Sequence, residues 1–272
     1  MKPLDPKGTA LITGASTGIG AIYADRLAKR GYDLILVARN RNRLATLAHR
    51  IKLETGRSVE PLTADLNDKA DLATVETVLR TSTSITMLVN NAGVAATTSL
   101  LTSDIDVMQE MIDLNVAALT RLTYAAVPGF VARGRGTVVN IASVVAITPE
   151  SLNGVYGGTK AFVLAFSQSL QHELADKGIR VQAVLPGATA TELWDKAGLP
   201  VHQLPMAIVM SAEAMVDAAL AGLDQDEVVT IPALANKAEW DRFEAARRAM
   251  SGHLSRAVPA PRYNVKANGA AA

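Results

Sequence analysis

The stretch "TALITGASTGIG" (residues 9–20) decides the fold, because a short apolar run is followed at once by a glycine-rich turn. Residues 9–13 have the pattern of a buried β-strand, and residues 18–30 have the length and apolar period of a helix. Glycines at such a junction let the turn tighten and let a pyrophosphate reach the free N–H groups at the start of the helix. The spacing G-x-x-x-G-x-G is a weak signal by itself, since a plain tight turn would also produce it.

The alternation of strand and helix patterns continues along the chain. Apolar, β-branched runs predict strands at residues 9–13, 33–38, 58–63, 85–90, 136–142, 179–186 and 227–232. Helical patterns lie between them, at residues 18–30, 41–55, 68–80, 104–132 and 157–177. Several strands are continuously apolar, which is typical of parallel strands buried on both faces. The sequence therefore predicts an α/β fold, a doubly wound Rossmann-type parallel sheet of about seven strands with helices on both faces.

The composition bounds the class of protein. Of the 272 residues, 49% are hydrophobic and 19% are charged, and the formal net charge is +1. This balance is typical of a compact soluble protein, and not of a disordered chain or one that coats nucleic acid. No linker or repeat interrupts the pattern. We therefore expect a single domain over residues 1–272, with an extra helix at 234–250 and a loose, flexible tail at 259–272.

The sequence contains no cysteine, which excludes disulfides and thiolate metal sites. We expect no metal site and a cytoplasmic location. The amino terminus has no convincing signal-peptide cleavage pattern, and no segment approaches the roughly 20 apolar residues that span a bilayer. The expected partner is a small molecule, with no role for nucleic acid or membrane.

The end of the second predicted strand indicates which dinucleotide the turn would bind. NAD is held there by a carboxylate on the ribose 2′-hydroxyl, whereas the 2′-phosphate of NADP needs positive charge. The segment "LILVARNRNRL" has no acid at the strand end, and Arg39 follows Ala38 directly. This favours NADP(H) over NAD(H). We interpret Arg41 and Arg43 as the solvated start of the next helix.

The segment "NGVYGGTKAF" (residues 153–162) places Tyr156 and Lys160 at helical spacing. Residues i and i+4 share a helix face, so the chain itself brings the phenol and the ammonium together. A reductase needs an acid within hydrogen-bond reach of the carbonyl oxygen. Free tyrosine has a pKa of about 10, and a nearby ammonium favours the phenolate. The pair is a candidate acid and the group that tunes it.

Taken together, these motifs resemble the short-chain dehydrogenase/reductase family, in its compact single-domain branch, from about Lys7 to Pro232. "TGASTGIG" is similar to the family's cofactor turn, "NNAG" (90–93) to its fourth-strand motif, and "PG" (186–187) to its loop after a later strand. Tyr156 and Lys160 match its Y-x-x-x-K pair. Ser143 lies 156 − 143 = 13 residues before the tyrosine, the spacing of the family's serine, and Asn115 in "DLNVAAL" matches its asparagine.

The resemblance implies a role for each matching residue. The catalytic residues would be Asn115, Ser143, Tyr156 and Lys160. Ser143 would donate a second hydrogen bond to the substrate oxygen, Lys160 would also hold the ribose hydroxyls, and Asn115 would position a water that connects the lysine to solvent. The implied cofactor-binding residues are Gly14, Ser16, Thr17, Ile19, Gly20, Arg39, Asp65, Leu66, Asn91, Ala92, Gly93, Tyr156, Lys160, Pro186, Gly187, Thr189 and Thr191.

The implied activity is hydride transfer between NADP(H) and a carbonyl or secondary alcohol. The segments after Ser143 and Gly93 and the substrate loop at 192–206 are mainly apolar, which favours a ketoreductase acting on an uncharged, partly hydrophobic substrate. Trp194, His202 and Met206 are candidate lid residues. Two alternatives stay open: a non-catalytic NADP(H)-binding sensor or assembly protein, and an NAD(P)-dependent alcohol dehydrogenase that works in the oxidative direction.

Two helical segments predict self-association. Residues 111–127 and 157–170 are apolar around much of the helix, which indicates burial on more than one side. Members of the resembled family pair these two helices across a subunit boundary, so we expect a homodimer or homotetramer.

The sequence also departs from the family pattern. Thr17 stands where many NADP-dependent members carry a second basic residue, and Gly157 and Gly158, between Tyr156 and Lys160, are expected to clear space for cofactor or substrate.

Overall fold

The computed structural model describes residues 7–265, and along the sequence the chain divides into two compact units, the first ending at Pro232 and the second beginning at Ala233. The second unit contains the predicted extra helix, α9 (Lys237–Ala249), capped by the side chain of Asn236. In the predicted tail, Pro261–Tyr263 form one 3₁₀ turn, and residues 266–272 lie outside the described part of the chain.

The first unit is built on one parallel sheet of seven strands in the order β3-β2-β1-β4-β5-β6-β9. This order starts in the middle and winds outward in both directions, which confirms the predicted Rossmann-type fold. The strands are β1 (Thr9–Thr13), β2 (Asp33–Ala38), β3 (Val59–Thr63), β4 (Ile85–Asn90), β5 (Gly136–Ile141), β6 (Ile179–Val184) and β9 (Val229–Thr230).

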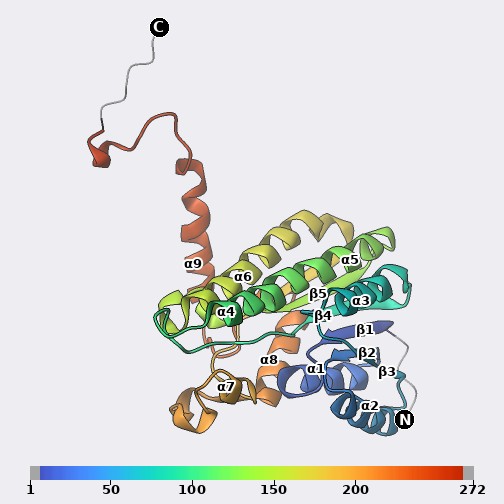
Figure 1. The fold of residues 1–272 in the computed structure, drawn as a ribbon. Coiled ribbons are helices and arrows are strands. Elements are labelled where there is room, and N and C mark those ends of the chain that lie inside the picture. Colours follow the sequence, from blue (N-terminus) through green and yellow to red (C-terminus); the bar gives the residue numbers. More distant parts are fainter. Residues whose placement is uncertain (1–6, 266–272) are drawn as a thin grey trace. The chain divides into compact units, whose positions relative to one another are not determined.

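Helices cover both faces of this sheet (Figure 1). One face carries α1 (Gly18–Lys29), α2 (Arg41–Thr55) and α8 (Ala212–Asp224). The other carries α3 (Lys69–Thr81), α5 (Leu119–Ala132) and α6 (Gly154–Leu174). The carboxyl ends of all seven strands therefore meet at one edge, where the connecting loops gather.

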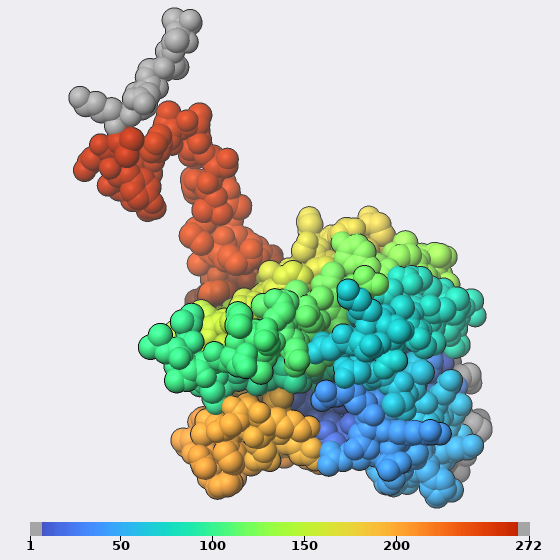
Figure 2. Space-filling model, in the orientation of Figure 1, coloured from blue at the N-terminus to red at the C-terminus, as the bar shows by residue number. Residues whose placement is uncertain are grey.

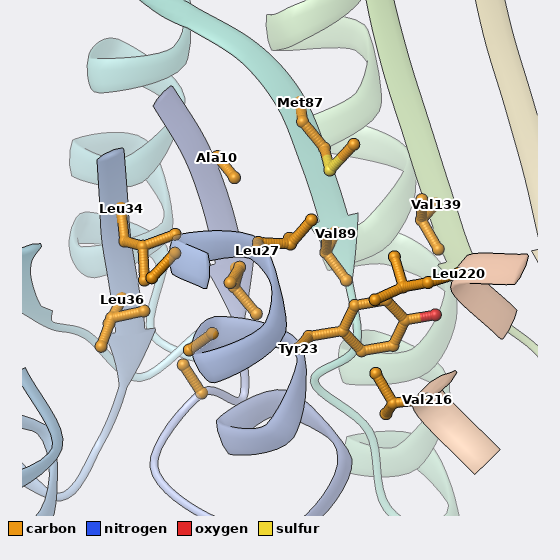
Figure 3. Packing of buried hydrophobic residues seen from close by; sticks show 14 of the residues in the cluster. Ala10, Tyr23, Leu27, Leu34, Leu36, Met87, Val89, Val139, Val216 and Leu220 are labelled. Carbon is orange, nitrogen blue, oxygen red and sulfur yellow. The ribbon is translucent and has the colours of Figure 1, made fainter. Parts of the chain in front are cut away.

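A packed apolar layer lies on each side of the sheet. Figure 3 shows the layer under α1 and α8, where the fully buried ring of Tyr23 packs among Val139, Val216 and Leu220. Phe130 of α5 is the largest side chain of the opposite layer. Each fully buried side chain of this size contributes about 2 kcal/mol to folding, so these two layers stabilise the sheet and the helices that pack on it.

The helix predicted at 104–132 is not continuous. It consists of α4 (Ile105–Ile112), a π-helical segment (Asp113–Ala118) and α5, which contains Pro128. A π-helical turn carries one more residue than an α-helical turn, so it shifts the apolar face without ending the helix. An apolar pattern read along the chain does not reveal such a shift.

A second sheet, absent from the sequence prediction, joins β7 (Thr189–Ala190) to β8 (Met210–Ser211). These short strands pair at the two ends of the predicted substrate loop and close its base. Between them lie α7 (Leu193–Lys196) and two 3₁₀ turns, Val201–Gln203 and Met206–Ile208. None of the helices within residues 7–265 is both long and apolar enough to cross a bilayer.

Candidate active site

The turn between β1 and α1 is shaped by its glycines. Gly14 and Gly18 have positive φ angles, +64° and +53°, which other residues adopt only with strain. Gly20 faces the backbone of the turn, where a Cβ would contact the carbonyl oxygen of Gly14. The glycines of the motif therefore form the tight turn that the sequence predicts, and they leave its backbone open to a ligand. Ala15 is buried beneath it, whereas Ser16, Thr17 and Ile19 are partly accessible.

The first turn of α1 is suited to an anion. Its N-cap residue, Thr17, makes no side-chain hydrogen bond to the helix, and the first turn contains no acidic residue. By contrast, Asn, Asp or Ser side chains cap α2, α3, α4, α6, α8 and α9. Free N–H groups and the positive end of the helix dipole favour a phosphate group. The residues here fit the pyrophosphate of a dinucleotide.

The "NNAG" motif is tied directly to this turn. The hydroxyl of Thr13 accepts hydrogen bonds from the backbone N–H groups of Asn91 and Ala92, each at 3.0 Å. The side-chain amide of Asn91 donates to the carbonyl oxygens of Thr13 (2.9 Å) and Gly14 (3.2 Å). The ends of β1 and β4 are thereby locked together, which puts Asn91, Ala92 and Gly93 beside the phosphate turn.

Arg39 and Asp65 lie together beyond the ends of β2 and β3. Their charged groups are 3.8 Å apart, and the Arg39 side chain is 70% exposed. The guanidinium is thus free to exchange a weak carboxylate partner for another anion. Leu66, the next residue, is buried in the core.

Ser143 and Tyr156 meet at the carboxyl end of β5. The hydroxyl of Ser143 accepts from the backbone N–H of Val145 and donates to the carbonyl oxygen of Pro186, both at 3.4 Å. Burial raises the pKa of Tyr156 above its ordinary value of 10.0, while the hydrogen bond with the Ser143 side chain acts in the opposite direction. The phenol therefore keeps its proton at neutral pH when no ligand is bound.

Lys160 is buried one turn further along α6. Its Nζ donates to the carbonyl oxygen of Ile141 at 2.9 Å and lies 5.9 Å from the centre of the Tyr156 ring. Burial lowers the pKa of Lys160 from 10.5 to about 8. The sequence led us to expect that the ammonium would favour the tyrosinate. In the structure burial dominates both residues, and it favours the uncharged form of each.

Asn115 lies within the π-helical segment and is 2% exposed. Its amide exchanges hydrogen bonds with the backbone of Val94 (3.0 and 2.9 Å) and donates to the hydroxyl of Thr159 (3.1 Å). A Cβ on Gly93 would lie 3.0 Å from the Asn115 Oδ1 and 3.5 Å from the Lys160 Nζ. Asn115 and Lys160 are therefore close neighbours, with the glycine between them.

The loop after β6 completes the edge. Pro186 and Thr189 are buried, Gly187 and Thr191 are partly accessible, and the indole N–H of Trp194 donates to the carbonyl oxygen of Thr189 at 3.0 Å. Within the substrate loop, the side chains of His202 and Met206 are exposed, so their role as lid residues stays a prediction. A hydrogen bond holds this loop to the segment after Gly93: the hydroxyl of Thr97 donates to the carbonyl oxygen of Ala197 at 2.8 Å.

Residues 8–200 match the sequence profile of the short chain dehydrogenase family, which is more than half of the chain. The chain belongs to the short-chain dehydrogenase/reductase family. A solved short-chain dehydrogenase from Sphingobium yanoikuyae in complex with NADPH is 50% identical, with a TM-score of 0.91, and the match covers 94% of this chain and all of that one. A bulky-bulky ketone specific alcohol dehydrogenase from Comamonas testosteroni is 44% identical, with a TM-score of 0.87 and coverage of 94% and 98%.

More distant curated relatives share the same core. The very-long-chain 3-oxoacyl-CoA reductase of Rattus norvegicus is 36% identical over 188 residues, which is 68% of this chain and 60% of that protein. The present chain thus spans less than two thirds of that relative's length. Together these relatives show that the chain is an oxidoreductase acting on CH–OH or carbonyl groups and that its cofactor is NADP(H).

Two residues around the family motifs were not predicted. Asn153 is buried as the N-cap of α6 and accepts from the N–H groups of Val155 and Tyr156. Its amide N–H₂ donates to the Thr98 carbonyl oxygen (2.7 Å) and the Ser103 hydroxyl (3.1 Å). An asparagine just before a helical pattern is a recognisable cap signal, but its second pair of bonds depends on tertiary structure.

Arg43 is the other residue, and here the sequence interpretation was incomplete. Instead of being a simply solvated helix start, it pairs with Glu192 at 2.9 and 3.1 Å. No local pattern connects two residues so far apart in the sequence.

Proposed function

We propose that this chain is an NADPH-dependent ketoreductase whose acid is Tyr156. The observation that carries the proposal is the buried phenol of Tyr156 at the carboxyl edge of the sheet, with the Ser143 hydroxyl beside it and the Lys160 Nζ 5.9 Å from its ring centre. A reduction needs a proton donor within hydrogen-bond reach of the carbonyl oxygen, and the phenol of Tyr156 is such a donor.

The proposed steps follow from the side chains. When bound, NADPH supplies the hydride that reduces the carbonyl carbon. Tyr156 donates its phenolic proton to the oxygen as negative charge develops there, and Ser143 donates a second hydrogen bond to the same atom. The ammonium of Lys160, held by the carbonyl of Ile141, stabilises the phenolate that is left. Asn115 fixes Val94 and Thr159 around this group.

The cofactor site is proposed along the same edge. The turn at Gly14–Gly20 and the uncapped start of α1 would hold the pyrophosphate, and Arg39 would hold the 2′-phosphate. Asn91–Gly93 and the loop from Pro186 to Thr191 would hold the nicotinamide half. Arg39 is well placed for this role, because it is exposed and its 3.8 Å pairing with Asp65 is weak.

We propose a bulky, uncharged ketone as the substrate. The two segments that border the site expose large apolar side chains, and these are Leu100, Leu101, Ile105, Met206 and Ile208. The two segments are joined by the hydrogen bond from Thr97 to Ala197. Apolar surface of this kind favours a ligand with large hydrophobic groups on both sides of the carbonyl. The similarity to the bulky-bulky ketone specific enzyme supports the same class.

A ketone panel with NADPH and NADH tests this function, read by nicotinamide absorbance. We expect turnover with diaryl and long aryl-alkyl ketones, little with small or anionic ketones, and a preference for NADPH. Tyr156→Phe should lower turnover by about 10²- to 10⁴-fold while calorimetry still detects NADPH binding. Undiminished turnover in that variant, or a preference for anionic keto acids, would contradict the proposal.

A further inference from the structure

The substrate loop is tied to the cofactor half of the protein by an ion pair. The Arg43 guanidinium contacts both carboxylate oxygens of Glu192, which is 149 residues away in the sequence, at 3.1 and 2.9 Å. Arg43 lies in the first turn of α2, and Glu192 is the first residue of the loop. Figure 2 shows the orange segment around α7 lying beside the blue surface of the N-terminal part.

Arg43 is a candidate second cation for the 2′-phosphate. Its backbone N–H donates to the side chain of Asn40, the residue that follows Arg39, so both arginines leave the same turn. The Arg43 side chain is 49% exposed and thus free to change partner. A ribose phosphate that carries close to two negative charges is suited to two guanidinium groups. The turn at Thr17 contributes no basic residue of its own.

The carboxylate of Glu192 occupies the Arg43 guanidinium, so it competes there with any other anion. Glu192 follows Thr191, which lies over the phosphate turn, since a Cβ on Gly18 would be 3.1 Å from the Thr191 Cγ2. The Arg43 side chain holds the pKa of Glu192 below its ordinary value, so the carboxylate is charged at neutral pH. The ion pair therefore joins the turn of Arg39, where the 2′-phosphate is proposed, to the loop that lies over the phosphate turn.

We propose that the 2′-phosphate of NADP(H) displaces Glu192 from Arg43, so that binding of this cofactor releases the first turn of the substrate loop. Arg43 thereby becomes a second residue that distinguishes NADP(H) from NAD(H). The inference rests on the proposed position of the 2′-phosphate beside Arg39. By linkage, a change that frees Arg43 from Glu192 must strengthen NADP(H) binding by the same factor by which the phosphate loosens the loop.

Calorimetry with NADP⁺ and NAD⁺ tests the competition. Glu192→Gln should bind NADP⁺ about two- to fivefold more tightly, the range of a partly exposed ion pair, and NAD⁺ unchanged. Arg43→Gln should weaken NADP⁺ alone, and adding Glu192→Gln to it should bring no gain. Asp195→Asn is the matched control, because it removes an exposed charge from the same loop without touching the Arg43 pair. An equal gain in that control, or a gain that survives without Arg43, overturns the proposal.

Hydrogen exchange of residues 192–204 provides a readout separate from affinity. The probe 2′,5′-ADP carries the 2′-phosphate but has no nicotinamide end with which to contact the loop. We expect it to speed exchange in the native protein, with 5′-AMP having no such effect, and to have no effect in Glu192→Gln. Slower or unchanged exchange with 2′,5′-ADP overturns the proposal. Arg39→Gln separates the premise: if NADP⁺ preference survives it, the assigned phosphate position is itself wrong.

Discussion

Two effects act in opposite directions on the charge of Lys160: the proposed chemistry needs the ammonium form, and burial favours the neutral amine. Stabilising a phenolate requires the ammonium form, yet the side chain is 7% exposed and is held by the carbonyl of Ile141. Burial without a carboxylate partner lowers the pKa to about 8. This value lies close enough to neutral pH for the ammonium to dominate there, while the proton is released readily above it.

The lowered pKa of Lys160 predicts a rise in stability with pH. The unfolded chain holds the lysine proton up to about pH 10.5 and the folded protein loses it near 8, so the unfolded state binds more protons between these values. From about pH 8 to about pH 9.5, Lys160 should add roughly 2 kcal/mol to the free energy of unfolding. Urea unfolding of the native protein and of Lys160→Met measures this as the difference between their pH slopes.

The window stays below the pKa of ordinary tyrosines, about 10, so phenol ionisation does not enter. Lys52→Met, which removes an exposed lysine from α2, is the control and should follow the native slope. A Lys160→Met slope equal to that of the native protein would mean that the lysine keeps its proton inside the fold.

The start of α6 is the element that connects Tyr156, the proposed acid, to the proposed substrate side. Asn153 binds Tyr156 N–H and Val155 N–H with its oxygen, and the segment at Thr98 and Ser103 with its nitrogen. One buried amide thereby sets both the beginning of the helix and the position of the loop. We infer that Asn153 is a positioning residue for the site.

Replacing Asn153 separates these two tasks. Serine also caps helices but is too short to reach the loop, whereas alanine does neither. Asn153→Ser should lower kcat/KM for a bulky ketone about tenfold or more through the loop, with the Kd of NADPH unchanged. Asn153→Ala should match it kinetically and lose about 1 kcal/mol more in the free energy of unfolding. A native KM and kcat in Asn153→Ser would show that the loop bonds have no positioning role.

Some elements of this fold follow from local sequence patterns, and others do not. The unit from β1 to α1 was predictable because strand, glycine turn and helix are local patterns. The π-helical segment around Asn115 and the β7–β8 pair were not, since one shifts a helical phase and the other joins residues about twenty apart through a single short pairing. The contacts of Asn153 and Glu192 depend on the assembled loops, so no local pattern contains them.

The glycine pair shows the same limit within one helix. A Cβ on Gly157 would lie 3.3 Å from the Pro149 carbonyl oxygen, so this glycine makes room for the preceding turn of the chain. Gly158 is exposed and would meet nothing within 4 Å among the described atoms. Gly157 therefore abuts the segment that follows Ser143, whereas Gly158 lies on the outer face of α6.

At the scale of the whole molecule, the outer face of α6 exposes a cluster of aromatic rings that a partner could cover. The rings of Phe162 and Phe166 stack at 5.6 Å, and Phe166 stacks on Tyr124 of α5 at 6.5 Å. Tyr124 is 69% exposed and Phe162 is 39% exposed. The inner face of α6 carries Tyr156 and Lys160. We propose that a second copy of the chain covers these aromatic rings in a homodimer or homotetramer.

Sedimentation at micromolar concentration tests this assembly. The native protein should sediment as a dimer or tetramer, and Phe162→Glu should weaken association by at least about 100-fold, because a charge in an apolar interface costs several kcal/mol. Leu53→Glu is the matched control, since Leu53 is an equally apolar, 73% exposed side chain on α2, away from this face. If association is native-like in Phe162→Glu, or equally lost in Leu53→Glu, the aromatic face is not the interface. Because α6 carries Tyr156 and Lys160, the proposed catalytic pair, on its other side, dissociation should also lower kcat, while leaving the Kd of NADPH nearly unchanged.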